Sequence, residues 1–346
     1  MPKPLKFQKL MRILSLILAG GKGERFWPLS RKNKPKQLLD LFTGKPLILE
    51  AYERAKLFGK VYIITTQELQ KQIKKIIKDG KFIIEPFGKN TAPAIYYSIK
   101  NLKIKDDDII FVQTSDHIIK NLQAFKNDVN LGIEIAKMNY IVVFGIKPTR
   151  IETGFGYVEV GKEIKDNVYK VKKFHEKPSF EKAKEYIQMG NFFWNSGMFI
   201  FNKKTIIKAY EKFSYDIIQT FENSKNKLEF YKNVRNISID YAIMEKSDNI
   251  ALVKATFEWE DLGLYTSLEN IFKKDENGDI ILGEVAKINT KNCIIISKEG
   301  ICGVYGVENL IIVKTKDAVL VISKENAQNV RDIVNLLKNM NFEEYL

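Results

Sequence analysis

A segment near the start of the chain combines glycines with positive charge, and this combination is suited to binding phosphate. The segment, residues 18–39, reads LAGGKGERFWPLSRKNKPKQLL and holds three glycines, six basic residues and two prolines. Glycines allow backbone N–H groups to approach phosphate oxygens closely, and an arginine guanidinium binds two such oxygens at once. The segment therefore predicts a phosphate site. Its candidate residues are Gly20, Gly21, Gly23, Arg25 and Lys36.

Two common types of phosphate loop do not match this segment. It lacks the Walker A pattern G-x-x-x-x-G-K-[ST]. Gly21 and Gly23 form G-x-G, but Phe26 occupies the position where the dinucleotide-binding pattern has its third glycine. On the residues alone, the alternative to a phosphate site is an ordinary strand-to-helix turn whose charges are solvated.

Two aspartates that follow strand-like runs are candidates for binding a metal ion. Asp116 follows the apolar run 109–113, so we expect it at the carboxyl end of a strand, where open parallel sheets bind their ligands. Asp261 follows a second β-like run, in WEDLG. Carboxylates from separate loops, completed by phosphate oxygens and water, suit Mg²⁺. The residues alone are equally consistent with Asp116 as a helix N-cap.

In their order along the chain, these and further motifs resemble those of the sugar-1-phosphate nucleotidylyltransferases. The glycine segment is similar to the family pattern L-A-G-G-x-G-x-R-x-x-P-L-[ST] followed by P-K, and its FWPLSR and PKQ resemble the mannose-1-phosphate guanylyltransferases. The other matching segments are EPFGKNTAPAI, VQTSDHII, TGFGYVEVG, FHEKP, WNSGMFIF, ISIDYAIMEK, FEWEDLGLYTSL and GDIILGEVAKINTKNCIIIS, so the resemblance covers about residues 12–340. Glu24 and Thr114 depart from the pattern, which usually has Thr or Ser and then Pro at these positions. A carboxylate at position 24 is expected to weaken triphosphate binding unless it faces away or helps to hold a metal ion.

The resemblance implies a transferase that moves a guanylyl group from GTP to α-D-mannose 1-phosphate and releases GDP-mannose and pyrophosphate. It implies in-line attack of the sugar phosphate on the α-phosphorus and Mg²⁺ as the cofactor, held by Asp116 and Asp261. The implied catalytic residues are Arg25, Lys36, Asp116 and Lys177. The implied nucleotide-binding residues are Leu18, Ala19, Gly20, Gly21, Gly23, Arg25, Lys36, Glu85, Asn90, Thr91, Ser115 and Asp116. The implied sugar-phosphate residues are Gly154, Gly156, Tyr157, Glu176, Lys177 and Asn195.

Within the implied sugar site, Glu176 and Asn195 are expected to bond hydroxyl groups and Lys177 to bind the phosphate. The alternative for Glu176 and Lys177 is a solvated ion pair. His117 and His175, the two histidines of the chain, are not expected to act as bases. The second pKa of a phosphate monoester is about 6, so the attacking phosphate is already largely ionised at neutral pH. We expect both histidines to brace their loops.

The apolar and amphipathic runs predict an α/β fold whose elements position these residues. Strand-like runs at 13–18, 61–65, 82–85, 109–113 and 141–146 alternate with helix-like stretches at 47–58, 67–78, 91–102 and 122–139. This alternation favours a Rossmann-like, mostly parallel mixed sheet flanked by helices, as in nucleotidyltransferases of GT-A-like fold. After KKDENGD, short β-branched runs predict a small β-rich domain, either β-helix-like or a small sandwich, closed by a terminal helix. We therefore predict a catalytic domain at 1–272 and a C-terminal domain at 273–346.

Composition narrows the partners. Lys and Arg number 56 and Asp and Glu number 42, a formal charge of +14, which favours anionic partners. Only seven of the basic residues are Arg, and the lysines are spread along the chain, so we do not predict a nucleic-acid partner. Lys3, Lys6, Lys9 and Arg12 before ILSLILAG resemble a signal peptide, but a buried first strand is favoured. No run reaches the ~18 apolar residues of a membrane span, and Cys293 and Cys302 form no disulfide framework, so a cytoplasmic location is expected.

Other functions remain open at this point. One is the same chemistry on glucose 1-phosphate with dTTP or UTP, and another is a regulatory homologue that binds nucleotide without catalysis. The presence of Arg25, Lys36 and Asp116 favours catalysis over the regulatory alternative. Charge alone supports a nucleic-acid binder. Because the chain ends soon after the β-rich region, we expect no fused isomerase domain and no isomerase activity. The oligomeric state is open, with a homodimer among the options.

Overall fold

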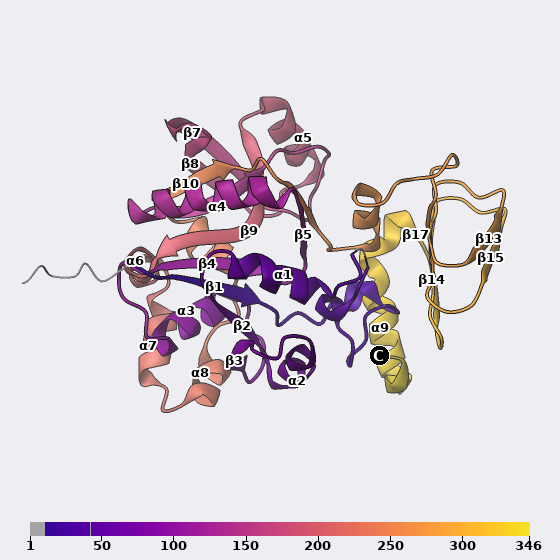
Figure 1. Ribbon diagram of the computed structural model, residues 1–346, viewed down its shortest axis with the longest axis horizontal. Helices are drawn as coiled ribbons and strands as arrows, with labels where there is room; N and C mark the ends of the chain where they lie inside the picture. The colour runs from indigo at the N-terminus through magenta and orange to yellow at the C-terminus, as the bar shows by residue number, and fades with distance from the viewer. Residues whose placement is uncertain (1–10, 42) are drawn as a thin grey trace, which may run out of the picture. The chain divides into compact units, whose positions relative to one another are not determined.

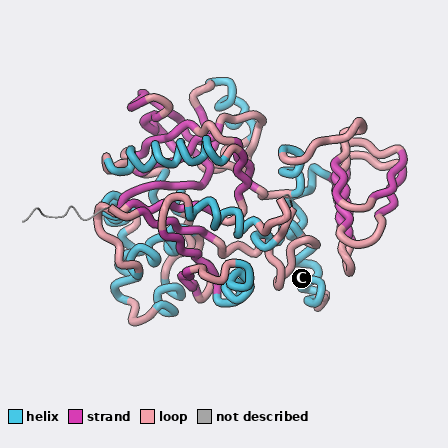
Figure 2. The backbone as a smooth tube through the Cα atoms, viewed as in Figure 1, coloured by secondary structure: helices cyan, strands magenta, loops and turns pink. Residues whose placement is uncertain are grey.

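The computed structural model describes residues 11–41 and 43–346, so Lys3, Lys6 and Lys9 lie outside the described residues. The chain forms two compact units (Figures 1 and 2). The first, here called the sheet unit, comprises residues 11–18, 52–114 and 120–258. The second, here called the β-helix unit, comprises residues 19–51, 115–119 and 259–346. The units are discontinuous in sequence, and the predicted boundary at residue 272 stays a prediction.

The sheet unit is built on a nine-stranded mixed sheet in the order β3-β2-β1-β4-β9-β6-β10-β8-β7. Strand β1 pairs in parallel with β2 on one side and β4 on the other, and its four inner residues are buried, so the predicted buried first strand is confirmed. Strand β9 is antiparallel to both β4 and β6. The strands are β1 (Ile13–Leu18), β2 (Lys60–Thr66), β3 (Lys81–Glu85), β4 (Ile109–Thr114), β6 (Ile141–Ile146), β7 (Tyr157–Lys165), β8 (Val168–His175), β9 (Phe192–Asn202) and β10 (Ile250–Lys254).

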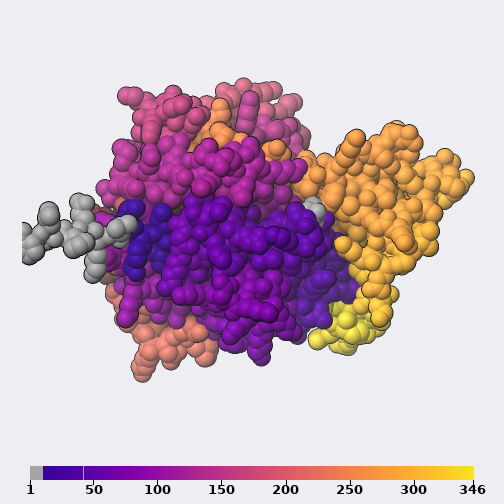
Figure 3. All heavy atoms as spheres, in the orientation of Figure 1, coloured from indigo at the N-terminus to yellow at the C-terminus, as the bar shows by residue number. Residues whose placement is uncertain are grey.

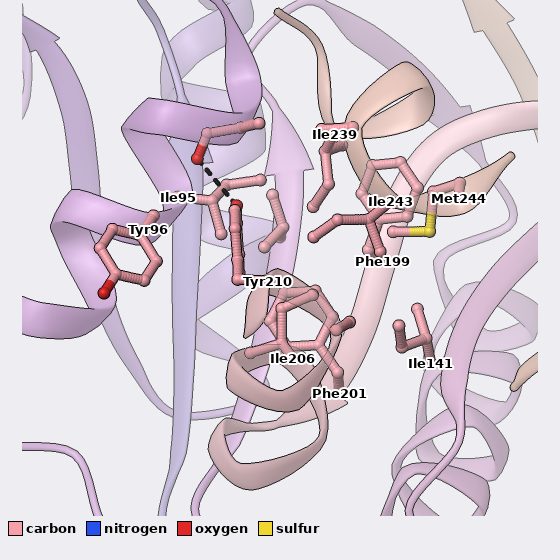
Figure 4. Close-up of a cluster of buried hydrophobic side chains, with 14 of the residues drawn as sticks. Ile95, Tyr96, Ile141, Phe199, Phe201, Ile206, Tyr210, Ile239, Ile243 and Met244 are labelled. Carbon is pink, nitrogen blue, oxygen red and sulfur yellow. Dashed lines mark hydrogen bonds between the residues drawn. The ribbon is translucent and has the colours of Figure 1, made fainter. Parts of the chain in front are cut away.

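Helices cover both faces of this sheet because the strands are apolar on both sides. Strand β4 shows the alternation: Ile110 and Val112 join one core cluster, whereas the Phe111 ring packs 6.2 Å from that of Phe125 on α4. The first cluster includes side chains of α3, α6 and the π-helix η3 (Asp240–Met244), and Figure 4 shows Tyr210 there, donating to the carbonyl oxygen of Ala92 at 2.8 Å. The helices are α1 (Leu47–Lys56), α2 (Gln67–Ile76), α3 (Thr91–Asn101), α4 (Leu122–Lys137), α5 (Phe180–Met189), α6 (Lys203–Phe213), α7 (Tyr215–Asn223) and α8 (Lys227–Asn233).

The C-terminal strands of the β-helix unit stack as parallel rungs, which decides between the two predicted architectures in favour of the β-helix. Strand β12 pairs in parallel with β14, β14 with β16, and β13 with β15, so alternate strands along the chain lie side by side. Ile280, Ile294 and Ile311 occupy one buried row. The elements are β12 (Ile280–Leu282), β13 (Val285–Ile288), β14 (Ile294–Ser297), β15 (Cys302–Tyr305), β16 (Leu310–Lys314), β17 (Val319–Ser323) and α9 (Val330–Asn339).

The structure bears on the two cysteines and on the question of a membrane-spanning helix. Cys293 is buried, Cys302 is partly exposed, and both are free thiols. Within the part of the chain that the structure describes, no helix is both long and apolar enough to cross a bilayer. The cytoplasmic location stays a prediction.

Candidate functional site

The glycine segment opens the β-helix unit with two short 3₁₀ turns, η1 (Glu24–Phe26) and η2 (Lys36–Leu38). Gly23 has a φ of 67°, and a Cβ there would lie 2.3 Å from the Cβ of Lys36, so only glycine allows the two turns to approach this closely. Around Gly21, by contrast, no atom lies within 4 Å of the position that a Cβ would take. The loop is therefore closed on the Lys36 side and open at Gly21.

Lys36 is a buried cation held between carboxylates. Its side chain is 9% exposed, and its Nζ lies 2.6 Å from Oδ2 of Asp116 and 4.0 Å from Oδ1 of Asp261. The same Nζ donates to the carbonyl oxygen of Leu262. A buried ammonium is tolerated only when it is paired and hydrogen-bonded, and Lys36 meets both conditions.

The two predicted metal ligands meet because two short strands pair. Strand β5 (His117–Lys120) runs beside β11 (Glu258–Asp261) in a two-stranded sheet. One oxygen of Asp116, one oxygen of Asp261 and one ring nitrogen of His117 lie within 4.8 Å of one another. The His117 ring also packs edge-on against Trp259, with ring centroids 5.2 Å apart, which agrees with a bracing role. Two carboxylates at this spacing suit a hard divalent cation.

Arg25 adds a second positive charge close enough to Asp261 to feel the charge of that carboxylate. Its Nε is buried and has no hydrogen-bond partner in residues 11–41 and 43–346. Burial lowers the pKa of Arg25, the charge of Arg331 on α9 lowers it further, and Asp261 opposes both effects. The guanidinium therefore sits among other charges without a carboxylate to satisfy its Nε. We call Arg25, Lys36, Asp116 and Asp261 the phosphate cluster.

Glu24, the departure from the family pattern, is neutralised within the same unit. Its Oε1 lies 3.1 Å from the Nζ of Lys338 on α9. A carboxylate paired in this way adds little net negative charge to the loop. The structure thus supplies a partner for Glu24 that its position in the sequence did not suggest.

In the sheet unit, a second group of charged residues gathers at the end of β8. The Glu176 side chain is 7% exposed and pairs with the Nζ of Lys177. A Cβ on Gly156 would lie 2.6 Å from Oε2 of Glu176, so the glycine makes room for this carboxylate. Lys177 has a φ of 47°, a conformation that is strained for a long side chain and that is concentrated at functional sites. Burial acts to lower the pKa of Lys177, but the hydrogen bond to Glu176 and its charge outweigh it and raise the pKa.

Asn195 lies on β9 and is hydrogen-bonded to Asp240, a carboxylate for which the sequence predicts no role. Its Nδ2 donates to Oδ1 of Asp240 at 3.0 Å, and its Oδ1 accepts from the backbone N–H of Gly197 at 3.1 Å. Asp240 is the first residue of the π-helix, a type of turn that is frequent at functional sites. Burial, and then the charge of Glu176, raise the pKa of Asp240 to about 6. The motif ISIDYAIMEK is part of the family resemblance, but nothing in its spacing distinguishes Asp240 from its neighbours.

A cavity of 570 Å³ lies in the sheet unit at this point and is here called the Glu176 cavity. It brings together residues that were predicted for different ligands, because Asn90 and Thr91 line it beside Glu176 and Lys177. The full lining is Asn90, Thr91, Glu176, Lys177, Asn236, Ile237, Ser238, Asp240 and Tyr241. Asn195 is not in this lining and reaches the cavity through Asp240.

The remaining predicted residues take varied positions. Asn90 has a φ of 69° and a ψ of −175°, a region that is otherwise almost confined to glycine, and as the N-cap of α3 its side chain accepts from the N–H of Thr91. Glu85 ends β3; burial raises its pKa to about 7, and its Oε1 has no hydrogen-bond partner in the described residues. The Tyr157 hydroxyl is buried and accepts from the N–H of Glu152 at 3.2 Å, so it is engaged within the fold. Gly154 is exposed.

Comparison with known proteins places the chain among nucleotidyl transferases. The family model "Nucleotidyl transferase" matches residues 14–278. The curated protein "Mannose-1-phosphate guanylyltransferase" of Klebsiella pneumoniae is 35% identical over 357 residues, which cover 96% of this chain and 75% of the relative. The chain belongs to the mannose-1-phosphate guanylyltransferase family.

A second family model and two solved structures also support the fold. A second model, "MannoseP isomerase/GMP-like beta-helix domain", matches residues 283–337, which confirms the β-helix. A Thermus thermophilus structure, titled "mannose-1-phosphate geranyltransferase", is 30% identical with a TM-score of 0.86 and covers 95% of this chain and 100% of that one. A Helicobacter pylori structure titled "mannose-6-phosphate isomerase" is also 30% identical, with a TM-score of 0.64 over 72% of this chain and 100% of that one.

Proposed function

We propose that this chain transfers a guanylyl group from GTP to α-D-mannose 1-phosphate and releases GDP-mannose and pyrophosphate. The observation that carries the proposal is the phosphate cluster. In this cluster Lys36 packs against Gly23 of the glycine loop and is buried between Asp116 and Asp261. This arrangement suits a triphosphate and a divalent cation, and membership in the mannose-1-phosphate guanylyltransferase family supports GTP and mannose 1-phosphate as the substrates.

In this proposal the glycine loop and the phosphate cluster hold the phosphates of GTP. The open backbone at Gly21 receives phosphate oxygens, and Arg25 and Lys36 neutralise charge that builds up on them. Asp116 and Asp261 would hold Mg²⁺, and their carboxylate oxygens fit that ion. When bound, Mg²⁺ would supply charge neutralisation for the triphosphate and for the departing pyrophosphate.

The Glu176 cavity would hold the sugar phosphate. Lys177 binds its phosphate, while Glu176 and Asp240 accept hydrogen bonds from sugar hydroxyls. An oxygen of the sugar phosphate attacks the α-phosphorus, the bond from that phosphorus to the β-phosphate oxygen breaks, and pyrophosphate leaves with the bonding electrons. No proton is removed from the nucleophile, so the reaction needs no general base. Catalysis then consists of positioning and electrostatic stabilisation.

A matrix of nucleotides and sugar phosphates tests this proposal. Pyrophosphate release is measured for GTP, ATP, UTP and dTTP with mannose 1-phosphate and with glucose 1-phosphate, with and without Mg²⁺. The proposal expects the highest kcat/KM for GTP with mannose 1-phosphate and no release without a sugar phosphate. Higher efficiency for UTP or dTTP with glucose 1-phosphate would contradict it. Conversion of mannose 6-phosphate to fructose 6-phosphate is assayed in parallel, because one structural neighbour carries an isomerase title.

A further inference from the structure

The terminal helix α9 lies against the glycine loop within the β-helix unit. Val330 and Val334 of α9 are buried in the same core cluster as Phe26 of η1. Lys338 of α9 pairs with Glu24 of η1 at 3.1 Å. In Figure 3 the yellow spheres of the C-terminal end lie directly against indigo spheres of the early chain, in agreement with these contacts. One face of α9 therefore covers η1.

Arg331 lies on that same face. It precedes Lys338 by seven residues, which on an α-helix of 3.6 residues per turn returns the side chain to within about 20° of the same direction, about 10 Å further along the axis. Val334, three residues after Arg331 and therefore its neighbour on the helix surface, is buried in the cluster that contains Phe26. Because Lys338 reaches Glu24, the geometry directs Arg331 toward the same turn, which also carries Arg25.

The positive charges of Arg331 and Arg25 lack partners that a bound anion would supply. Arg331 is exposed and has no ion-pair or hydrogen-bond partner in the described part of the chain, and the buried Nε of Arg25 has none there either. The charge of Arg331 contributes, after burial, to the lowered pKa of Arg25. Two neighbouring guanidinium groups repel each other, and a polyphosphate between them replaces that repulsion with charge-assisted hydrogen bonds.

We propose that Arg331, contributed by the C-terminal helix, binds the terminal phosphates of GTP, and the pyrophosphate that they become, together with Arg25. This inference rests on the proposed function. It makes the helix that closes the β-helix part of the nucleotide site: Lys338 positions the loop through Glu24, and Arg331 contacts the leaving group.

The test uses the reverse reaction, in which pyrophosphate and GDP-mannose yield GTP and mannose 1-phosphate. Arg331→Gln is expected to raise the KM for pyrophosphate about 10-fold or more, while the KM for GDP-mannose changes less than about 2-fold, since a charge-assisted contact is lost at one substrate only. Arg331→Lys is expected to recover part of the affinity. Lys298→Gln, which removes the same charge from an exposed position in the β-helix, serves as the matched control and is expected to match the wild type.

Two outcomes would overturn the inference. One is an unchanged KM for pyrophosphate in Arg331→Gln. The other is a KM shift that Lys338→Gln reproduces and Arg331→Lys does not relieve, because this pattern would show that α9 only supports the loop. Calorimetric titration of the wild type and Arg331→Gln with Mg²⁺-pyrophosphate gives the same comparison without turnover. A wild type that binds pyrophosphate through Arg331 but makes no GDP-mannose would refute the proposed function and leave this inference standing.

Discussion

The phosphate cluster and the Glu176 cavity handle charge in opposite ways. In the phosphate cluster Lys36 is already paired, buried between Asp116 and Asp261, whereas the buried Nε of Arg25 has no partner in the described residues. In the Glu176 cavity burial, and then the charge of Glu176, raise the pKa of Asp240, and the neighbouring cation Lys177 is half exposed. The first arrangement suits a ligand that brings its own phosphates and cation. The second suits a ligand that brings hydroxyl donors to the two carboxylates.

We expect the largest loss of activity from substitutions of the carboxylates in the phosphate cluster. Asp116→Asn and Asp261→Asn are each expected to lower kcat by about 100-fold or more, because each removes a charge that would anchor the cation opposite the triphosphate. Rates are measured across an Mg²⁺ titration. Glu258→Gln, on the same strand β11 but with a side chain 73% exposed, is the matched control and should titrate like the wild type. If both aspartate variants do so as well, the metal assignment is wrong.

A smaller and substrate-specific effect is expected at the cavity. Lys177→Gln should raise the KM for mannose 1-phosphate about 5- to 20-fold and leave the KM for GTP nearly unchanged. A charge-assisted contact is worth about 1.5–3 kcal/mol when fully buried, and the half exposure of Lys177 reduces this. Lys184→Gln, an exposed lysine on α5, controls for loss of charge. A weaker affinity for GTP with intact affinity for the sugar phosphate would reverse the assignment of the two sites.

The burial of Asp240, together with the charge of Glu176, predicts a pH-dependent stability difference. The pKa of Asp240 is raised from 3.8 to about 6, so the folded state favours the protonated acid, and its stabilising contribution is present below about pH 4 and lost as pH rises through 6. Asp240→Asn is neutral at every pH. The variant should therefore melt above the wild type at pH 8, with the gap closing toward pH 4, although its kcat/KM for mannose 1-phosphate falls. Melting curves at both pH values measure this, and a variant that melts below the wild type at pH 8 would contradict it.

The smallest effect concerns the choice of sugar. Mannose and glucose differ in the direction of one hydroxyl, and an unpaired buried polar group costs about 1–3 kcal/mol, so a preference of roughly 5- to 150-fold for mannose 1-phosphate is expected. Asn195 holds Asp240 in place, so Asn195→Ala should lower both efficiencies and narrow their ratio a few-fold. This change is measured as the ratio of kcat/KM for mannose 1-phosphate to kcat/KM for glucose 1-phosphate at a fixed concentration of GTP. An unchanged ratio would move sugar selection away from Asn195.

The same contrast explains what the sequence could predict. The phosphate loop is contiguous, so its glycines and basic residues indicate a phosphate site from residue type alone, although an ordinary strand-to-helix turn stays open and the role of each residue comes from the resemblance. The positions of the strands of the parallel sheet, and so of their ends, could also be predicted, because apolar runs alternate with amphipathic ones. Asp240 and Arg331 could not be identified in this way. Asp240 depends on a π-helix turn, and Arg331 on the packing of α9 against a turn far earlier in the chain, as the spacing of 314 residues between Glu24 and Lys338 shows.

The fate of the two ends of the triphosphate tests the central claim most directly. The chain is incubated with mannose 1-phosphate, Mg²⁺ and GTP labelled with ³²P at either the α- or the γ-phosphorus, and the products are separated. Guanylyl transfer predicts that the α label appears only in GDP-mannose and the γ label only in pyrophosphate, and that neither forms when mannose 1-phosphate is omitted. Appearance of the γ label in inorganic phosphate or on the sugar, or no labelled GDP-mannose at all, would contradict the account.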